Sequence, residues 1–339
     1  MALTADDVAG HPGVHAAIHQ QSRLLLQVYD GNPRLASVFG TQHRWLMAQV
    51  ALALHFRRCS SGKGRGINSA QVLDAVSRHG VASRNTADAF LKEMLKYGFA
   101  RQVSGAADKR TRPIEPTETS LEAIHGWIGI HLATLDRLDH GRRLETYLGT
   151  PDALAALHPG IADGLLSSAR VRKPERTFSL FTWLNNGGLI MDWLIAGIEE
   201  TDAEAERVQT GVVSIAALAQ RLNLSRTHLS RKLRDAEALG SIGWQGKRGE
   251  SVMWVSASFR EEYAMAQAVK LAIIDAAFAE CFQQTPDEAA PAMPKVPLPM
   301  TVTPSEAPAL SAVEGRGLSA TRLLRSFTDR ASRVCGMLR

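Results

Sequence analysis

The sequence has little that could cross-link the chain, hold a metal through paired thiols or cross a membrane. Only three of its 339 residues are cysteines, and none belongs to a Cys-x-x-Cys pair. A disulfide framework or a zinc cage is therefore not expected, and free thiols suit a reducing cytoplasm. The most apolar stretch, residues 45–56, is too short to span a bilayer, and the acidic start MALTADDVAG lacks the order of a signal peptide. We expect a cytoplasmic protein without a membrane partner.

The sequence also lacks a recognisable set of catalytic or metal-binding residues. His11, His15 and His19 repeat every four residues, but the Pro-Gly pair at 12–13 interrupts a helix there, so no metal is expected. No nucleophile, base and orienting residue can be assembled from local spacing. The glycine-rich run at 62–66 lacks a preceding strand and the rest of a phosphate-binding loop. We therefore expect neither an enzyme nor a cofactor.

Acidic residues are missing from the outer face of one segment, residues 213–233, whose apolar spacing predicts a helix-turn-helix. Asn223 stands where the chain must turn, and Asn tolerates a left-handed backbone. Ser225 is placed to cap a second helix, in which Leu229 and Leu233 face the core. The outward side chains can donate hydrogen bonds to phosphates and base edges. They are Arg226, Thr227, His228, Ser230, Arg231 and Arg234.

Helical periodicity dominates the whole chain, and strand-like runs are short. The length suits two domains, and half of the 14 prolines lie between 286 and 308, which predicts a disordered tail. The expected helices cover 14–29, 41–58, 68–79, 83–97, 118–138 and 257–282, with an apolar helix or broken helix at 178–200. The expected parts are an N-terminal helical arm (1–40), a first module (41–138), a connector with short helices (139–177), a second module (178–283) and the Pro-rich tail (284–339).

The two modules are predicted to be an internal duplication. Moving residues 67–100 forward by 142 positions aligns them without a gap with the second module. Ser83-Arg84 then falls on Ser225-Arg226, and Gly98 falls on Gly240. The matching Ser-Arg pair stands at the start of each second helix, where a helix N-terminus favours phosphate.

A basic hairpin is expected after each second helix. In the first module, 99–103 and 113–115 flank a loop with several cations. In the second, 242–245 and 252–255 flank a loop that contains Lys247 and Arg248. Such a hairpin lies along the DNA backbone or minor groove as a wing. The predicted fold is therefore mainly α with short β-hairpin wings, as tandem winged helix-turn-helix modules joined by long flanking helices.

The first module resembles the MarR family of bacterial transcription regulators. Asp108-Lys109-Arg110-Thr111, followed by Ile114, Pro116, Thr117 and Glu118, is similar to that family's wing. The resemblance covers about one hundred residues, and it implies that Asp108 braces the wing and Arg110 enters the minor groove. The Gly that usually follows the Thr-Glu element is missing, and MarR proteins carry one such module per chain and dimerise. Here the second module could replace the missing subunit, which leaves a monomeric pseudo-dimer or a homodimer open.

These observations predict a sequence-specific transcription regulator that binds double-stranded DNA, and a net charge of +5 suits a polyanionic partner. In the second module most of the positive charge lies on the second helix. In the first module it lies on the wing. Two alternatives stay open: a plasmid-type replication initiator with tandem winged helices, and a protein-interaction scaffold. The expected DNA-binding residues are Ser83, Arg84, Asn85, Thr86, Lys92, Lys109, Arg110, Arg112, Ser225, Arg226, Thr227, His228, Ser230, Arg231, Arg234, Lys247 and Arg248.

Two further features allow more than one reading. Cys59 lies beside Arg57 and Arg58, and cations lower a thiol's pKa, so a redox-sensing cysteine competes with an ordinary helix-end thiol. The Trp and Phe residues of the long helices suit core packing, although a cleft for a small-molecule effector between the modules would be lined in the same way.

Overall fold

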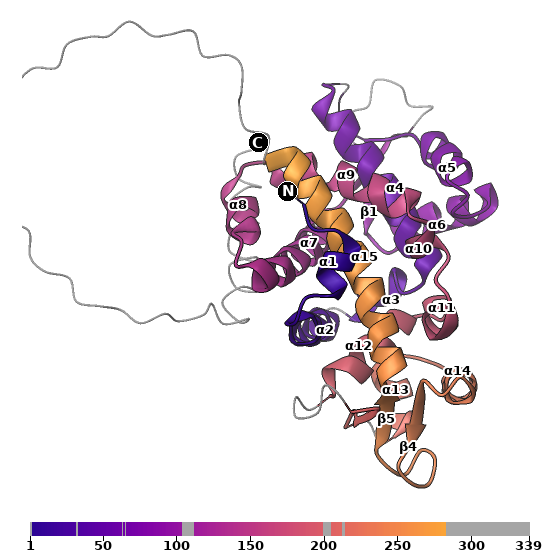
Figure 1. Cartoon of the computed structure of the whole chain (residues 1–339). Helices are drawn as coiled ribbons and strands as arrows, with labels where there is room; N and C mark the ends of the chain where they lie inside the picture. Colours follow the sequence, from indigo (N-terminus) through magenta and orange to yellow (C-terminus); the bar gives the residue numbers. More distant parts are fainter. Residues whose placement is uncertain are drawn as a thin grey trace, which may run out of the picture. The chain divides into compact units, whose positions relative to one another are not determined.

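The chain folds mainly into helices, with two small antiparallel sheets that each contain a hairpin, as the sequence predicts (Figure 1). The computed structural model describes residues 2–31, 33–62, 64, 66–103, 112–198, 205–211 and 214–282. The predicted disordered tail at 284–339 lies outside these residues. No helix in the described ranges has the length and apolar character needed to cross a membrane.

A first block of the fold covers residues 42–139. Its long opening helix is capped by the Thr41 hydroxyl, which accepts from the backbone N–H of Arg44. Ile67 then pairs with Ile114 through two backbone hydrogen bonds of 2.8 and 2.9 Å, which adds a third strand position to the hairpin. The elements are α4 (Gln42–Ser60), α5 (Ser69–Arg78), α6 (Arg84–Lys96), β1 (Ala100–Gln102), β2 (Ile114–Pro116) and α7 (Glu118–Asp139).

A second block covers residues 187–282 and repeats this order. Its three strands form one sheet with the order β3-β5-β4, so the strand that precedes the two short helices pairs with the last strand. The elements are α12 (Gly187–Ala196), β3 (Arg207–Gln209), α13 (Ile215–Arg221), α14 (Arg226–Ala238), β4 (Ile242–Trp244), β5 (Met253–Ser256) and α15 (Ala257–Phe282).

The predicted shift of 142 positions relates the two blocks residue by residue over their central part. It carries α6 onto α14 and β1 onto β4 with identical bounds. Gly98 and Gly240 both have a positive φ, of 74° and 71°, which Gly adopts at no steric cost. Beyond the hairpin loop the shift falls to 139 positions, because β2 and α7 begin 139 residues before β5 and α15. The hairpin loop of the second block is therefore three residues shorter.

The remaining helices pack these blocks together. The segment predicted as an irregular connector contains a helix of 15 residues, α9, that tolerates Pro159 in its interior. This helix packs against α4 and α15, and its Leu157, Ile161 and Leu165 are fully buried. The other helices are α1 (Ala5–Ala9), α2 (Val14–Gly31), α3 (Pro33–Val38), α8 (Arg143–Gly149), α9 (Ala153–Ser167), α10 (Ala169–Arg172) and α11 (Arg176–Thr182).

Helix α15 is the central element of the fold. It runs diagonally through the view of Figure 1, from the sheet of the second block to the side of α9. It packs against α1, α2, α7 and α9 as well as β5. Because several helices cover it, its buried side chains occur along its whole length and include Phe259, Tyr263, Leu271 and Ile274. One helix thus belongs to the cores of both blocks.

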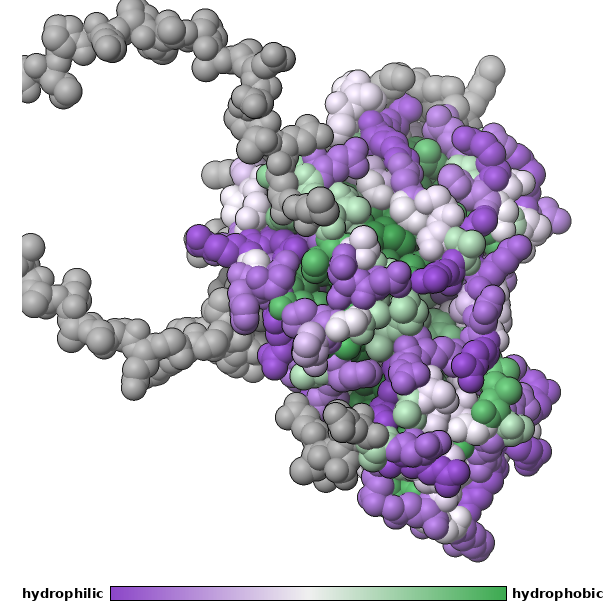
Figure 2. Space-filling model, viewed as in Figure 1, coloured by the Kyte–Doolittle hydropathy of each residue, from purple (hydrophilic) through white to green (hydrophobic). Residues whose placement is uncertain are grey.

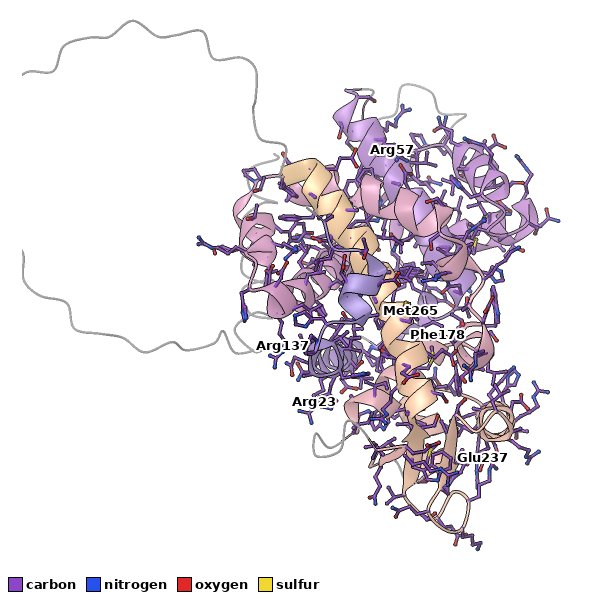
Figure 3. The ribbon with its side chains drawn as sticks, viewed as in Figure 1. Arg23, Arg57, Arg137, Phe178, Glu237 and Met265 are labelled. Carbon is purple, nitrogen blue, oxygen red and sulfur yellow. The ribbon has the colours of Figure 1, made fainter. Side chains whose placement is uncertain are left out.

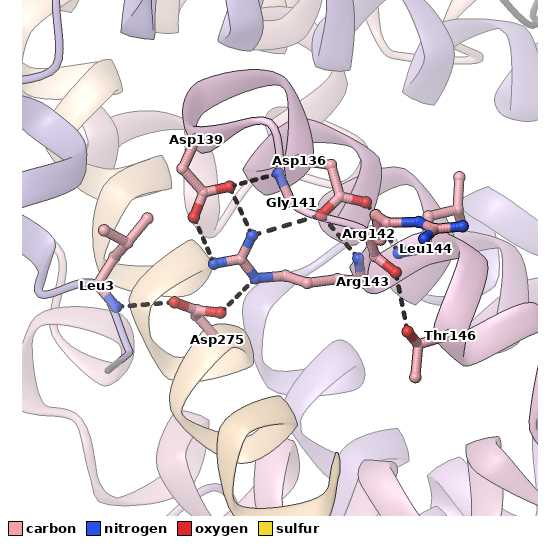
Figure 4. Close-up of polar contacts among 9 residues, drawn as sticks. All are labelled: Leu3, Asp136, Asp139, Gly141, Arg142, Arg143, Leu144, Thr146 and Asp275. Atoms are coloured by element: carbon pink, nitrogen blue, oxygen red, sulfur yellow. Dashed lines mark hydrogen bonds and ion pairs between the residues drawn. The ribbon is translucent and has the colours of Figure 1, made fainter. Parts of the chain in front are cut away.

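A buried ion cluster fixes α15 to the turn between α7 and α8 (Figure 4). The Arg143 guanidinium donates to Asp275 at 2.6 Å and to both carboxylate oxygens of Asp139 at 2.7 Å. Asp275 also accepts the backbone N–H of Leu3 at 2.7 Å, which ties the start of the chain to the same point. The carboxylate of Asp136 accepts two backbone N–H groups at the start of α8, from Arg143 and Leu144.

Candidate nucleic-acid interface

The predicted helix-turn-helix at 213–233 is formed by α13 and α14. Asn223 has a φ of 51°, the left-handed conformation that the turn requires and that Asn tolerates. The Ser225 hydroxyl caps α14 by accepting the backbone N–H of His228 at 3.4 Å. Leu218 and Leu222 of the first helix and its turn, and Leu229 and Leu233 of α14, are buried. The local sequence therefore fixes which face of α14 points outward.

The outward face of α14 is rich in donors and contains no acidic residue in its first two turns. Exposed residues on it are Ser225, Arg226, Thr227, His228, Arg231 and Arg234, while Ser230 is half-buried. Among the described residues, Arg226, Arg231 and Arg234 make no ion pair, whereas Lys232 is paired with Asp235 at 4.0 Å. Figure 2 shows hydrophilic surface on the hairpin and around α14, at the lower right of the view, together with a hydrophobic patch at the edge of the same region. Three guanidinium groups are thus free to bind an external anion.

The hairpin of the second block is fastened to α14 by Arg248. Its guanidinium donates to Glu237 at 2.7 Å and to the backbone carbonyl of Ser230 at 2.8 Å. It also lies over the ring of Trp244, 5.0 Å from the centroid. Figure 3 labels Glu237 at this junction. Arg248 lies between the hairpin and α14, where it sets their relative position, and its predicted contact with DNA stays a prediction.

Lys247, the other cation predicted at this hairpin, extends from its tip. It pairs with Glu250 at 2.7 Å, and its side chain is 76% exposed. Such an exposed pair is weak, so Lys247 can exchange this carboxylate for a phosphate.

The equivalent helix of the first block, α6, has the same frame but a neutralised surface. Ser83 caps it by accepting the backbone N–H of Thr86 at 3.2 Å, and Ser83, Asn85 and Thr86 are all exposed. Two of its cations, however, have partners within the chain, because Arg84 pairs with Asp74 and Lys92 pairs with Asp88. The first helix therefore offers less uncompensated positive charge than α14.

The hairpin of the first block is described only in part. Arg112 is exposed and has a φ of 35°, an unusual conformation for Arg. Arg101 on β1 pairs with Glu115 on β2 at 2.8 Å across the hairpin. Asp108, Lys109 and Arg110, which carry the predicted charge of this wing, lie outside the described residues.

The helix-turn-helix of the second block is held from behind by the N-terminal arm. The hydroxyl of Tyr29 donates to the backbone carbonyl of Arg221 at 3.0 Å, and Asp30 pairs with the Arg221 side chain at 2.6 Å. Asn186 donates to the carbonyl of Leu222 and to the hydroxyl of Ser37. Burial raises the pKa of the Tyr29 hydroxyl, which keeps it a donor. Sequence reasoning did not find this support, because its contacts join residues that are distant in the sequence, from 36 positions for Asn186 and Leu222 to 192 for Tyr29 and Arg221.

No metal-binding cluster of His, Cys, Asp and Glu occurs in the part of the chain that the structure describes. Cys59 is exposed near the end of α4, and its sulfur lies 3.7 Å from Nε2 of His55. Comparison with protein families, with curated proteins and with solved structures finds no match to the chain.

Proposed function

We propose that the chain is a sequence-specific DNA-binding transcription regulator, built from two winged helix-turn-helix modules that act as a pseudo-dimer. In each block a strand position, two short helices, a hairpin and a long helix follow in the order of a winged helix. A single chain with both modules can present two recognition helices to duplex DNA without a second subunit. The first module's similarity to the MarR wing supports the same assignment.

The exposed arginine face of α14 carries this proposal. Arg226, Arg231 and Arg234 project from a rigid, capped helix, and no carboxylate in the described chain neutralises them. Arginine is the side chain best suited to bidentate recognition of guanine and of phosphate. A helix that only packed against another protein would not need three unpaired cations, whose mutual repulsion destabilises the folded state.

The two modules would contribute unequally to recognition. On α6, the exposed pair of Arg84 with Asp74 is itself weak, but it places a carboxylate beside Arg84 that would repel a DNA phosphate. On α14 no carboxylate of the described residues forms an ion pair with Arg226. We therefore expect α14 to read base edges, while the first module adds phosphate contacts through its wing. The preferred site would then be asymmetric rather than a perfect palindrome, with recognition helices entering successive major grooves about 34 Å apart.

The test is duplex binding by the full chain, measured by fluorescence anisotropy between about 50 and 200 mM salt, on a site selected from random duplexes and on a scrambled version. Each phosphate contact contributes about 0.9 to the slope of log affinity against log salt. Over a fourfold rise in salt concentration, a variant that has lost one contact should therefore lose about 3.5-fold less affinity than the unchanged chain. We expect Arg226→Ala and Arg231→Ala to lower discrimination between the two sites by roughly 1–3 kcal/mol. Arg84→Ala should cost less. Arg110→Ala should weaken binding to both sites alike and flatten the salt slope.

Arg23→Ala and Arg137→Ala are matched controls. Both arginines are exposed and lie on α2 and α7, away from α14 in the view of Figure 3. If the controls weaken binding as much as Arg226→Ala does, affinity follows net charge and the assignment to α14 is wrong. Absence of salt-sensitive duplex binding would instead indicate a protein-interaction scaffold. Binding to direct repeats at an origin, rather than to promoters, would indicate a replication initiator.

A further inference from the structure

A basic segment of the chain links the two helix-turn-helix motifs. It consists of α10, the turn after it and the start of α11, residues 169–178. Seven consecutive residues in it, 170–176, contain four cations and only one carboxylate. The exposed cations are Arg170, Lys173 and Arg176, whereas Arg172 is half-buried. This cluster belongs to neither recognition helix, and the sequence signals of the two motifs do not include it.

The segment is bonded to both motifs, which fixes where its cations lie. On the side of the first block, Arg172 donates to the backbone carbonyl of His79 at 2.8 Å, and His79 caps the end of α5, just before the turn into α6. On the side of the second block, the hydroxyl of Thr177 is hydrogen-bonded to that of Ser241, which follows α14. Helix α11 also packs against α14. Figure 1 accordingly shows α10 and α11 between α6 and α14, on the right of the view.

Buried contacts hold the backbone of this segment in place. Val171 is buried, and its carbonyl accepts from the side chain of Gln42 at 2.5 Å. Thr177 is fully buried. The backbone N–H of Phe178 donates to the carboxylate of Glu262 at 2.7 Å. The exposed cations therefore project from a supported backbone, as the arginines of α14 do.

The positive charge of the segment is not neutralised by ion pairs with the described residues. Lys173 and Arg176 form none, and Glu175, the carboxylate within the segment, is exposed and pairs with neither of them. The guanidinium of Arg170 lies 3.6 Å from the sulfur of Met265, which carries no charge. Neighbouring cations repel one another, and an anionic partner removes that repulsion. The segment therefore offers a site for a polyanion.

We propose that Arg170, Lys173 and Arg176 bind the phosphate backbone of duplex DNA between the two half-sites that α6 and α14 contact. This inference rests on the proposed function, because it needs a duplex that meets both modules. Two recognition helices in successive major grooves leave a minor groove between them, flanked by phosphates of both strands. Lysine and arginine bind such phosphates without reading the sequence.

The covalent link gives this contact a second effect. Both modules and the segment belong to one chain, so the bonds to His79 and Ser241 hold the segment at a set position relative to α6 and α14. Phosphates bound there would fix the register of the duplex between the two half-sites. The spacing of the half-sites should therefore be strict, although the bases between them are free to vary.

The test compares the full chain with the double variant Lys173→Gln, Arg176→Gln on the selected and scrambled duplexes, between about 50 and 200 mM salt. The loss of two phosphate contacts should lower the slope of log affinity against log salt by about 1.8. It should weaken binding to both duplexes alike, because phosphates carry no sequence. The double variant Arg23→Gln, Arg137→Gln removes two other exposed arginines, and should leave the slope unchanged.

An altered duplex locates the contact. Neutral methylphosphonate linkages replace the phosphates between the two half-sites that the chain protects in the selected duplex. The unchanged chain should lose about as much affinity on this duplex as the Lys173→Gln, Arg176→Gln variant loses on the ordinary one. That variant should lose little more on the neutral duplex, whereas the loss from Arg226→Ala should add to that of the neutral linkages, because its contact is separate.

The outcomes separate this inference from the function on which it rests. Absence of salt-sensitive duplex binding by the unchanged chain would refute the proposed function. Salt-sensitive binding in which Lys173→Gln, Arg176→Gln behaves like the control variant would refute the segment's contact alone. Full addition of its loss to that of the neutral linkages would do the same. The four substituted side chains are exposed, so circular dichroism should show unchanged unfolding for both double variants.

Discussion

Arg143→Met tests how strongly the buried ion cluster holds the fold together. The guanidinium is 7% exposed and contacts three carboxylates, of which Asp136 and Asp139 lie at the end of α7 and Asp275 lies in α15. Methionine has a similar unbranched stem but no donor. After the substitution Asp275, which is 1% exposed, keeps only the backbone N–H of Leu3.

The expected loss is large because the change leaves a carboxylate buried without its cation. Removing one partner of a buried pair costs about 3–5 kcal/mol, much more than the pair contributes against an apolar replacement. Since each kcal/mol shifts the melting temperature of a domain of this size by about 2–4 °C, we expect a fall of roughly 6–20 °C. Urea unfolding followed by circular dichroism should show the same loss as a lower midpoint with an unchanged slope.

The loss should also depend on pH. The hydrogen bonds from Arg143 lower the pKa of Asp139 in the folded state. A lowered folded-state pKa contributes stability above the ordinary pKa of Asp, near 3.8, and this contribution disappears as the pH falls through the lowered value. The difference between Arg143→Met and the unchanged chain should therefore be full at pH 7 and smaller below about pH 4.

Arg142→Met is the matched control. Arg142 is the preceding residue and pairs with Glu145 at 2.7 Å, but its side chain is 77% exposed. Exposed pairs contribute about 0–1 kcal/mol, so this variant should be nearly neutral. The double variant Arg143→Met, Asp275→Asn should recover part of the lost stability, because no buried charge then lacks its partner. If Arg143→Met costs no more than Arg142→Met, the cluster does not hold α15 in place and the reasoning is wrong.

Three other substitutions test the second block and the core. Asn223→Val places a β-branched residue at a φ of 51° and should lower the free energy of unfolding by about 1–2 kcal/mol, whereas Asn223→Gly should not. Arg248→Ala should loosen the hairpin from Ser230 and Glu237, which limited proteolysis of the 245–252 loop would detect as faster cleavage. Burial lowers the pKa of His158 to about 3, so the chain should lose stability as the pH falls from 6.5 towards 3, by up to about 1.4 kcal/mol per pH unit from this residue. His158→Leu should flatten this dependence in urea titrations at pH 7 and 5; an unchanged dependence would contradict it.

Much of the fold could be predicted because local signals agreed. The Ser225 cap, the left-handed Asn223 and the buried Leu229 and Leu233 predicted where α14 begins and which face it buries, although the helix continues five residues beyond the predicted segment, to Ala238. The same signals, moved by 142 positions, gave α6. The closing helix α15 was also predicted with its observed bounds. Capping, periodicity and turn residues act over a few positions, and a single sequence displays them directly.

Packing between distant segments could not be predicted in the same way. Helix α9 was expected as part of an irregular connector because Pro159 and its glycines break helices in isolation, but burial against α4 and α15 outweighs that preference. The role of Arg248 was also missed, since a cation at a hairpin tip is usually solvated. Only the contact with Glu237 and Ser230 shows that it serves the fold. The pairing of Arg84 with Asp74 across two helices was hidden for the same reason.

The central position of α15 affects how the chain can be made. Leu3, Gln21 and Ser22 find their partners Asp275, Gln267 and Tyr263 more than 240 residues later. During synthesis, the apolar faces of α2, α7 and α9 that pack against α15 therefore remain exposed until the ribosome has released almost the whole of residues 1–282. Neither block should fold on its own. A nascent chain stopped before residue 257 would expose these faces and be a substrate for chaperones and proteases.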